Sequence, residues 1–178
     1  MTLNVAIVGC GIIGQKRANI IKTQINQKII AVVDVDKNKA KLMAKEFGCN
    51  YFNDWKQILE IKEIDAVVVS TSNDNLAKIS LEFAKKGKHI FCEKPLGINV
   101  NEVENAVNAA FISKVIFKTG FTLRFHPGIQ KIRKLVDENK IGKITFIRCR
   151  YGITGRPGYE KEWRANKSLS GGGELIDQ

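Results

Sequence analysis

The chain has 178 residues, of which 44% are hydrophobic and 26% are charged, an ordinary composition for a soluble globular protein. A chain of this length can bury one complete core and part of a second. It contains no apolar run near the roughly 18 to 20 residues needed to span a bilayer, and its N-terminus lacks the basic flank and cleavage site of a signal peptide. These features exclude a membrane-spanning protein and predict a cytoplasmic one.

The formal net charge of +11 raises the question of nucleic-acid binding. The basic residues are spread over both parts of the chain, and the lysines are not interleaved with aromatic residues. A solvated surface therefore explains the charge better than a nucleic-acid interface does. The four cysteines are scattered without a C-x-x-C pair, and the two histidines lack ligand spacing. This pattern predicts free thiols in a reducing compartment and no metal site.

The first predicted strand, residues 3–8, leads directly into the glycine pattern G-x-G-x-x-G. Gly9 permits a tight turn, Gly11 lets the backbone approach a pyrophosphate, and Gly14 lets the following helix (12–23) pack closely on the strand. The start of that helix also offers unpaired N–H groups and a partial positive charge to the phosphates. The sequence therefore predicts a dinucleotide site, with the alternative of a glycine-rich turn in a protein that binds no nucleotide. The residues expected near the phosphates are Gly9, Gly11, Ile12, Ile13 and Gly14.

A carboxylate follows the second predicted strand. The run 28–34 ends at Asp34, 20 residues after Gly14. A carboxylate at this place can accept hydrogen bonds from both hydroxyls of the adenosine ribose, and it would repel a 2′-phosphate. We therefore predict NAD as the cofactor, in preference to NADP.

Strand and helix patterns continue to alternate up to residue 120. Apolar residues recur at helical spacing at positions 76, 79 and 83 and again at 100, 103 and 107. Asn73 and Asn99 are placed to cap these helices at their starts, and Gly48 and Gly87 fall where helices end. Alternating βα units with apolar strands predict the α/β class, with a Rossmann-type, doubly wound parallel sheet. The predicted strands are 3–8, 28–34, 49–52, 66–70, 88–92 and 115–120.

The pattern changes after residue 120. Residues 127–139 have helical periodicity, and residues 143–151 alternate between polar and apolar side chains, as in an antiparallel strand with one wet face. Residues 152–172 form a long segment rich in glycine, serine and charge, of a length that usually has a function.

A last helical pattern starts near Gly173, and the chain ends at Gln178. A single antiparallel strand cannot form a sheet, so we expect a truncated polypeptide. We predict two domains: a dinucleotide-binding domain over 1–120, and over 121–178 the start of an incomplete α+β domain with a mainly antiparallel sheet.

Four further segments carry a resemblance to a known family. They are Glu93-Lys94-Pro95 after the fifth strand, Gly-Phe-Thr-Leu-Arg-Phe-His-Pro at 120–127, Trp163-Arg164, and Gly-Gly-Gly-Glu-Leu-Ile-Asp at 171–177. Together with the opening glycine pattern, their order and spacing resemble the glucose-fructose oxidoreductase / inositol dehydrogenase / MocA (Gfo/Idh/MocA) family across nearly the whole chain. The resemblance implies an NAD(P)-dependent oxidoreductase that transfers a hydride between nicotinamide and a carbinol or keto carbon. It also implies a sugar, cyclitol or sugar nucleotide as substrate and a homo-oligomer, either a dimer or a tetramer.

The resemblance assigns roles to three residues near the reacting atoms. Lys94 would hydrogen-bond the reacting oxygen and stabilise a developing alkoxide at the strand end. Glu93 would contact the nicotinamide ribose. Asp177 would pair with a histidine four residues later, the usual general base of the family, at a position beyond Gln178. The Lys94–Pro95 peptide bond is expected to be cis, as is common in the family.

Further roles implied by the resemblance concern the walls of the site. Ser70, Thr71 and Asn73 would contact the adenosine side and the nicotinamide ribose. Arg124 would lie near the substrate at the floor of the active site, unless it forms a surface ion pair at a domain junction. Trp163 and Arg164 would close over the nicotinamide, although Trp163 alone also fits a hydrophobic anchor for its segment.

One alternative function belongs to a different class. Because the expected histidine is absent from the chain, a non-catalytic dinucleotide-binding module or redox-sensing partner also fits the sequence. The two hypotheses differ in turnover: both predict binding of NAD, and only the enzyme hypothesis predicts hydride transfer.

Overall fold

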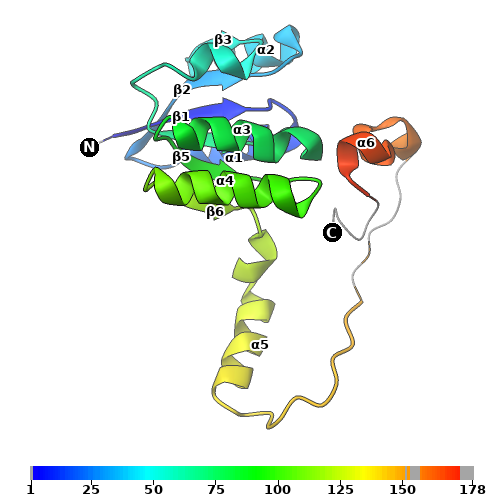
Figure 1. Cartoon of the computed structure of the whole chain (residues 1–178). Coiled ribbons are helices and arrows are strands. Elements are labelled where there is room, and N and C mark those ends of the chain that lie inside the picture. The colour runs from blue at the N-terminus through cyan, green and yellow to red at the C-terminus, as the bar shows by residue number, and fades with distance from the viewer. Residues whose placement is uncertain (1, 151, 153–156, 173–178) are drawn as a thin grey trace.

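The computed structural model describes residues 2–150, 152 and 157–172. Its six strands form one sheet in the order β3-β2-β1-β4-β5-β6, and every neighbouring pair is parallel (Figure 1). This is the Rossmann order, in which the chain reverses its direction of winding between β1 and β4. The predicted fold class is therefore confirmed. The strands are β1 (Leu3–Val8), β2 (Gln27–Val33), β3 (Asn50–Phe52), β4 (Ala66–Val69), β5 (His89–Cys92) and β6 (Phe117–Thr119).

Helices cover both faces of this sheet (Figure 1). Alternate residues of β1 point to opposite faces, so that Val5 and Ile7 join a core with α1 and α2, while Ala6 and Val8 join a core with α3. Burial on both sides explains why the strands are apolar at nearly every position. The covering helices are α1 (Ile12–Lys22), α2 (Lys37–Phe47), α3 (Asn73–Lys85) and α4 (Val100–Ile112), and a short turn of helix, η1 (Trp55–Ile58), follows β3.

Local signals set several of the helix ends. Gly48 adopts a φ of 65° and ends α2, as predicted, and the Asn99 side chain accepts a hydrogen bond from the Glu102 N–H at the start of α4. The prediction for Asn73 is wrong, because Ser72 is the N-cap and Asn73 is the first residue of α3. The Asn73 amide is turned into the protein instead, where a tertiary partner holds it.

The part of the chain after β6 differs from the prediction in one element. A helical turn, η2 (Thr122–Phe125), precedes α5 (Pro127–Asp137), which projects away from the sheet (Figure 1). The helix predicted over 127–139 is thus confirmed. The strand predicted over 143–151 is not formed over 143–150, which are exposed and pair with no strand among the described residues. An alternating pattern makes a strand only where a partner supplies the hydrogen bonds.

Residues 157–172, here called the return segment, lead back to the sheet. The segment contains η3 (Tyr159–Lys161), η4 (Trp163–Ala165) and α6 (Lys167–Ser170). Figure 1 shows α6 beside the start of α3, and the Asn73 Nδ2 donates to the Ser170 carbonyl oxygen at 3.0 Å. Both of these residues are 2% exposed. This buried contact fixes the return segment on the Rossmann sheet although 97 positions separate the two residues.

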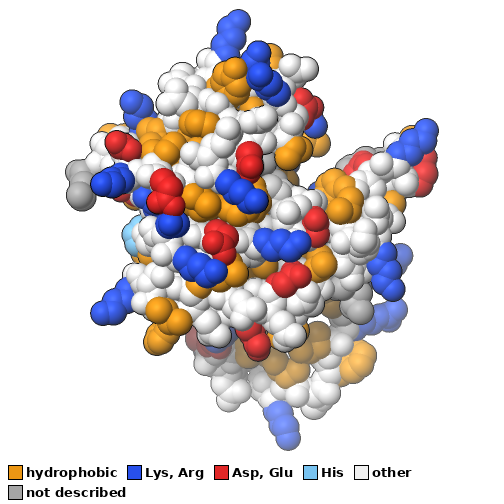
Figure 2. Space-filling model, turned by 45° about the horizontal axis from the view of Figure 1, so that its top comes forward, with side chains coloured by type: hydrophobic (Ala, Val, Ile, Leu, Met, Phe, Trp, Pro, Cys, Tyr) orange, Lys and Arg blue, Asp and Glu red, His pale blue; other side chains and the backbone are white. Residues whose placement is uncertain are grey.

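Charged side chains of both signs are interspersed on the face drawn in Figure 2, as expected for a solvated surface. Of the helices formed by the described residues, none has both the length and the apolar character that crossing a bilayer requires.

Candidate functional site

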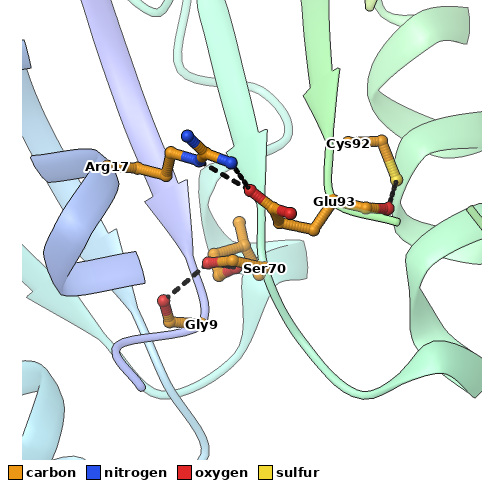
Figure 3. Close-up of polar contacts among 6 residues, drawn as sticks. Gly9, Arg17, Ser70, Cys92 and Glu93 are labelled. Atoms are coloured by element: carbon orange, nitrogen blue, oxygen red, sulfur yellow. Dashed lines mark hydrogen bonds and ion pairs between the residues drawn. The ribbon is translucent and has the colours of Figure 1, made fainter. Parts of the chain in front are cut away.

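The glycine loop between β1 and α1 is shaped by close contacts. Gly9 has a φ of 102°, and a Cβ on it would lie 2.5 Å from the Ser70 carbonyl oxygen. A Cβ on Gly14 would overlap the Gly9 carbonyl oxygen, so the first turn of α1 can approach β1 only with glycine there. The Ser70 hydroxyl donates to that same carbonyl oxygen at 2.9 Å (Figure 3). Two of the three glycines are therefore required by the fold itself.

Gly11 differs from the other two glycines. Its φ of −73° and ψ of −172° suit any residue, and an added Cβ would meet no atom of the described chain within 4 Å. It is the N-cap of α1, whose first turn has no acidic residue and receives no side-chain cap from the described residues. The first N–H groups of the helix, around Ile12 and Ile13, are thus available to an anion in the adjoining cavity.

The Asp34 carboxylate lies one residue beyond β2 and is oriented by the backbone. One oxygen accepts a hydrogen bond from the Cys10 N–H at 2.7 Å, and the other accepts one from the Asp36 N–H at 2.9 Å. These bonds hold a negative charge beside the glycine loop. Burial, and secondly the Asp34 charge, raise the pKa of the Cys10 thiol to about 12, so this thiol stays protonated and unreactive at neutral pH.

The loop after β4 holds three of the predicted site residues in place by contacts of its own. The Ser70 hydroxyl binds the glycine loop, and the Thr71 hydroxyl donates to the Ser72 carbonyl oxygen at 3.3 Å. Asn73 binds the return segment through its side chain. The side chains of this loop thus shape the site, while the loop itself borders the cavity.

Glu93 and Lys94 follow β5, at the same edge of the sheet as Asp34. The Lys94–Pro95 peptide bond is cis, which confirms the prediction. The Glu93 side chain is almost buried and forms an ion pair with Arg17 of α1, whose Nε lies 2.6 Å from the Glu93 Oε1 (Figure 3). Glu93 thus borders the cavity with a carboxylate that already has a cationic partner.

One cavity of about 1070 Å³ brings these groups together at the carboxyl ends of the strands. Ligands of open parallel sheets bind at this edge, where the winding reverses. Its volume is of the order of the roughly 300 to 1,000 Å³ typical of ligand sites. The predicted site residues that line it are Gly9, Gly11, Ile12, Ile13, Asp34, Ser70, Thr71, Asn73, Glu93, Lys94, Trp163 and Arg164.

The return segment supplies one wall of this cavity. The Arg164 guanidinium lies over the Trp163 ring, 4.4 Å from its centroid, and its Nη1 is 3.4 Å from a carboxylate oxygen of Glu162. Tyr159 borders the cavity as well. Trp163 and Arg164, nearly 70 positions after Lys94 in the sequence, therefore face the glycine loop across the same cavity.

Three predicted site residues are not among the described residues that line this cavity. Gly14 is buried within α1, where it permits the close packing on β1. Arg124 lies in η2, with its guanidinium 5.6 Å from the Phe121 ring centroid, and it borders a separate hollow of about 650 Å³ along α5. Asp177 falls outside the described residues. Their roles in binding substrate stay predictions.

The sequence motifs alone did not indicate Arg17 or the three residues that directly follow β3 as part of the site. Asn53, Asp54 and Trp55 line the cavity, as does the exposed Val35 beyond Asp34. Arg17 had a recognisable signal, because it stands three residues after Gly14 on the face of α1 that is otherwise buried. Nothing in the local pattern indicated that Asn53 to Trp55 belong to the site, since their position depends on how β3 pairs with β2.

The strand order, the glycine loop and the cavity at the switch point together define a Rossmann domain of the dinucleotide-binding type. A family model described as an oxidoreductase family with an NAD-binding Rossmann fold matches residues 3–121, and a model of the GFO/IDH/MocA C-terminal domain matches residues 129–178. The chain belongs to the Gfo/Idh/MocA family of oxidoreductases.

Several curated proteins and solved structures are similar to this chain. Inositol 2-dehydrogenase from Rhizobium meliloti is 31% identical over 147 residues, which cover 83% of this chain and 44% of that protein. The 2,7-anhydro-N-acetylneuraminate hydratase from Escherichia coli is 31% identical over 175 residues, covering 96% and 45%. The structure of scyllo-inositol dehydrogenase from Lactobacillus casei with bound NAD(H) and scyllo-inositol aligns with a TM-score of 0.76 at 29% identity, covering 82% and 44%. The chain thus spans about half the length of the curated relatives it matches.

Proposed function

We propose that this chain forms the cofactor site of an NAD-dependent oxidoreductase that moves a hydride between nicotinamide and a carbinol or keto carbon of a sugar, cyclitol or sugar nucleotide. The observation that carries the proposal is a single cavity bordered at once by the glycine loop, by Asp34 and by the Glu93–Lys94 turn. A dinucleotide needs all three: amides for its phosphates, an acceptor for its ribose, and a polar group beside its nicotinamide.

The identity of the proposed cofactor is inferred from the charges at the start of α1 and at Asp34. The start of α1 presents N–H groups and no competing acidic residue, which suits a pyrophosphate. The Asp34 carboxylate, oriented by the Cys10 and Asp36 amides, keeps lone pairs for two ribose hydroxyls. A 2′-phosphate at the same place would face a negative charge. We therefore infer a preference for NAD over NADP.

The chemical half of the proposal rests on Lys94. Bound NAD would supply the hydride acceptor. For the carbinol carbon to give up its hydride, the hydroxyl group must lose its proton, and negative charge develops on the oxygen as it does so. The lysine at the end of β5 would stabilise that charge and relay the proton. Glu93 would hold the nicotinamide ribose beside this lysine. Asp177 completes the proposed set as the partner of a later histidine.

The proposal also covers the domain division, the cellular compartment and the oligomeric state of the protein. Residues 1–120 form the dinucleotide-binding domain and 121–178 begin a substrate domain, in keeping with the two family models that match on either side of residue 125. A reducing compartment such as the cytoplasm suits the chain, because all four cysteines are free thiols. We further propose assembly into a dimer or a tetramer, which light scattering on the full-length protein would measure.

Two measurements test the function. Calorimetry with NAD⁺ and NADP⁺ on the full-length protein should give binding of NAD⁺ that is tighter than that of NADP⁺. The absorbance of reduced nicotinamide should then rise with an inositol, another polyol or a nucleotide sugar. A Lys94→Ala variant should slow the chemical step about 10²- to 10⁴-fold while leaving NAD⁺ affinity within about threefold. The exposed Lys78→Ala on α3 is the matched control and should change neither.

The outcomes separate the hypotheses. If neither dinucleotide binds to folded protein, the proposed function is wrong. Binding of NAD⁺ without turnover of any tested substrate would favour the non-catalytic module. Equal losses of affinity and rate in Lys94→Ala would remove the proposed role of that lysine.

A second reaction has support from the comparisons. The Escherichia coli hydratase matches 96% of this chain, so hydration of an anhydro sugar is a candidate for the same site. Product analysis distinguishes the two: a dehydrogenase accumulates reduced nicotinamide in step with product, whereas a hydratase adds water to its substrate without net change in the cofactor.

A further inference from the structure

The side chains of β5 divide between the two faces of the sheet. Cys92 lies in the core under α3, whereas Phe91 packs against the opposite core, under α1 and α2. Because alternate residues share a face, Glu93 points to the same side as Phe91. Its carboxylate therefore extends toward α1, on the side of the sheet that α1 and α2 cover.

Arg17 meets this carboxylate from α1. Its Nε and Nη2 lie 2.6 and 2.5 Å from the Glu93 Oε1, and its guanidinium carbon lies 4.9 Å from the centroid of the Phe91 ring. The two charged side chains are only 20% and 12% exposed. Phe91 of β5 and Glu93, which follows the strand on the same side, thus fix the guanidinium by ring contact and by a charged hydrogen bond.

Gly120 confines the other oxygen of the same carboxylate. A Cβ on Gly120 would lie 2.6 Å from the Glu93 Oε2, and the Gly120 N–H donates to the Cys92 carbonyl oxygen at 2.8 Å. The backbone of Gly120 is not in the left-handed region, so the fold of β6 alone does not require glycine. A side chain at this position would instead displace the Glu93 carboxylate from the place it now occupies.

The main chain of Glu93 makes the hydrogen bonds at both ends of the turn formed by residues 93–96, which is here called the Lys94 turn. Its N–H donates to the Val69 carbonyl oxygen at 2.9 Å, and its carbonyl oxygen accepts from the Leu96 N–H at 3.2 Å. Leu96 has a φ of 79°, a conformation that residues other than glycine keep only where surrounding contacts hold it. The position of Lys94 thus depends on where Glu93 is held.

We propose that Arg17 is a positioning residue: together with Gly120 it clamps the Glu93 carboxylate, and through Glu93 it holds Lys94 where the proposed reaction needs it. The catalytic part of this inference rests on the proposed function. Arg17 is not among the described residues that line the cavity, although its neighbour Lys16 is, so Arg17 acts through Glu93 and not on the cofactor phosphates. Net stability does not account for the pair, because a nearly buried ion pair generally stabilises a fold no more than apolar residues of similar volume.

Four single variants of the full-length protein and one double variant, Arg17→Met with Gly120→Ala, test the clamp. Arg17→Met removes the charge and keeps the length, Arg17→Lys restores a charge, and Gly120→Ala crowds the carboxylate from the opposite side. The control is Lys22→Met, because Lys22 lies on the same helix with its ammonium 5.7 Å from the Phe47 ring centroid, outside the site.

The expected pattern is a loss of kcat without loss of binding. Arg17→Met should lower kcat about 10- to 100-fold, the effect of displacing a catalytic group by a fraction of an ångström to one ångström, with KM for NAD⁺ unchanged within about threefold. Arg17→Lys should recover part of the lost rate, and Lys22→Met should match wild type. Arg17→Met and Gly120→Ala act on one carboxylate, so the double variant should lose little more than the worse single variant.

A second measurement needs neither substrate nor activity. Amide hydrogen exchange at Leu96 should speed up in Arg17→Met and in Gly120→Ala, and stay at the wild-type rate in Lys22→Met. If wild type shows no turnover while this exchange pattern is found, the proposed function fails and the clamp stands. Wild-type turnover with unchanged kcat in Arg17→Met, multiplied losses in the double variant, or a change confined to KM for NAD⁺ would overturn the clamp. Unchanged Leu96 exchange in both clamp variants would do so as well.

Discussion

The contrast among the three glycines of the loop leads to a sharp prediction for Gly11→Ala. The structure offers room for a methyl group at this position and a backbone that alanine adopts without strain. Two effects on stability oppose each other: alanine restricts the unfolded chain by about 0.4–1 kcal/mol, and it is a poorer N-cap than glycine by a similar amount. We expect the free energy of unfolding to change by less than about 1 kcal/mol.

The effect on the cofactor should be much larger. Gly11 borders the cavity, so the added methyl group occupies space next to the N–H groups at the start of α1. Moving a phosphate away from one such group removes a charge-assisted hydrogen bond, worth about 1.5–3 kcal/mol. The dissociation constant for NAD⁺ should therefore rise roughly 10- to 150-fold.

Calorimetric titration with NAD⁺ and urea unfolding, on the same preparations, measure both quantities. Gly48→Ala is the matched control, because Gly48 ends α2 with a φ of 65° and does not border the cavity among the described residues. It should lose about 1–2 kcal/mol of stability, because alanine is strained in the left-handed conformation, and it should keep its affinity. Unchanged NAD⁺ affinity in Gly11→Ala would refute the placement of the pyrophosphate. A stability loss as large as the loss of binding energy would refute the view that the fold itself tolerates a side chain there.

Three further predictions concern the loop, the ribose and the buried thiols. Gly14→Ala should lower the free energy of unfolding by about 1–3 kcal/mol in denaturant titrations, because its Cβ overlaps the Gly9 carbonyl oxygen; a stable variant would contradict the close packing of α1 on β1. Asp34→Asn should shift the ratio of NAD⁺ to NADP⁺ affinity toward NADP⁺ by about tenfold or more. The reason is that a carboxylate and a 2′-phosphate about 5 Å apart repel each other by roughly 3 kcal/mol at an effective dielectric of about 20. An unchanged ratio in calorimetry would exclude the proposed contact of Asp34 with the ribose. Burial raises the pKa of three thiols from 9.0 to about 11 or 12. Their contribution to the free energy of unfolding should be fully present below pH 9. It should fall as the pH rises toward 11 to 12, because the thiols ionise in the unfolded chain before they ionise in the folded protein. Cysteine-to-alanine variants should flatten that decline, and an equally steep decline in them would assign it to other groups; the thiols are Cys10, Cys49 and Cys92.

The sequence alone supported the fold class and the cofactor end of the site. Apolar strands alternating with helical periodicity predicted a covered parallel sheet, and Gly9, Gly14 and Asp34 stand where the pattern placed them. These features are local, because a tight turn, a helix start and a strand end depend on residues close together in the chain. The same holds for Gly48 and Asn99, which end and begin helices through their own backbone and side-chain preferences.

Tertiary structure decided the features that depend on distant partners. The strand predicted at 143–151 needed a neighbouring strand, and none of the described residues supplies one. Asn73 has the chemistry of a cap, yet it binds Ser170, 97 positions away. Arg17 and Glu93 are 76 positions apart and meet because β5 lies beside β4 and turns its alternate residues toward α1. Periodicity shows which side of an element is buried, but only the order and register of the strands determine which side chains meet there.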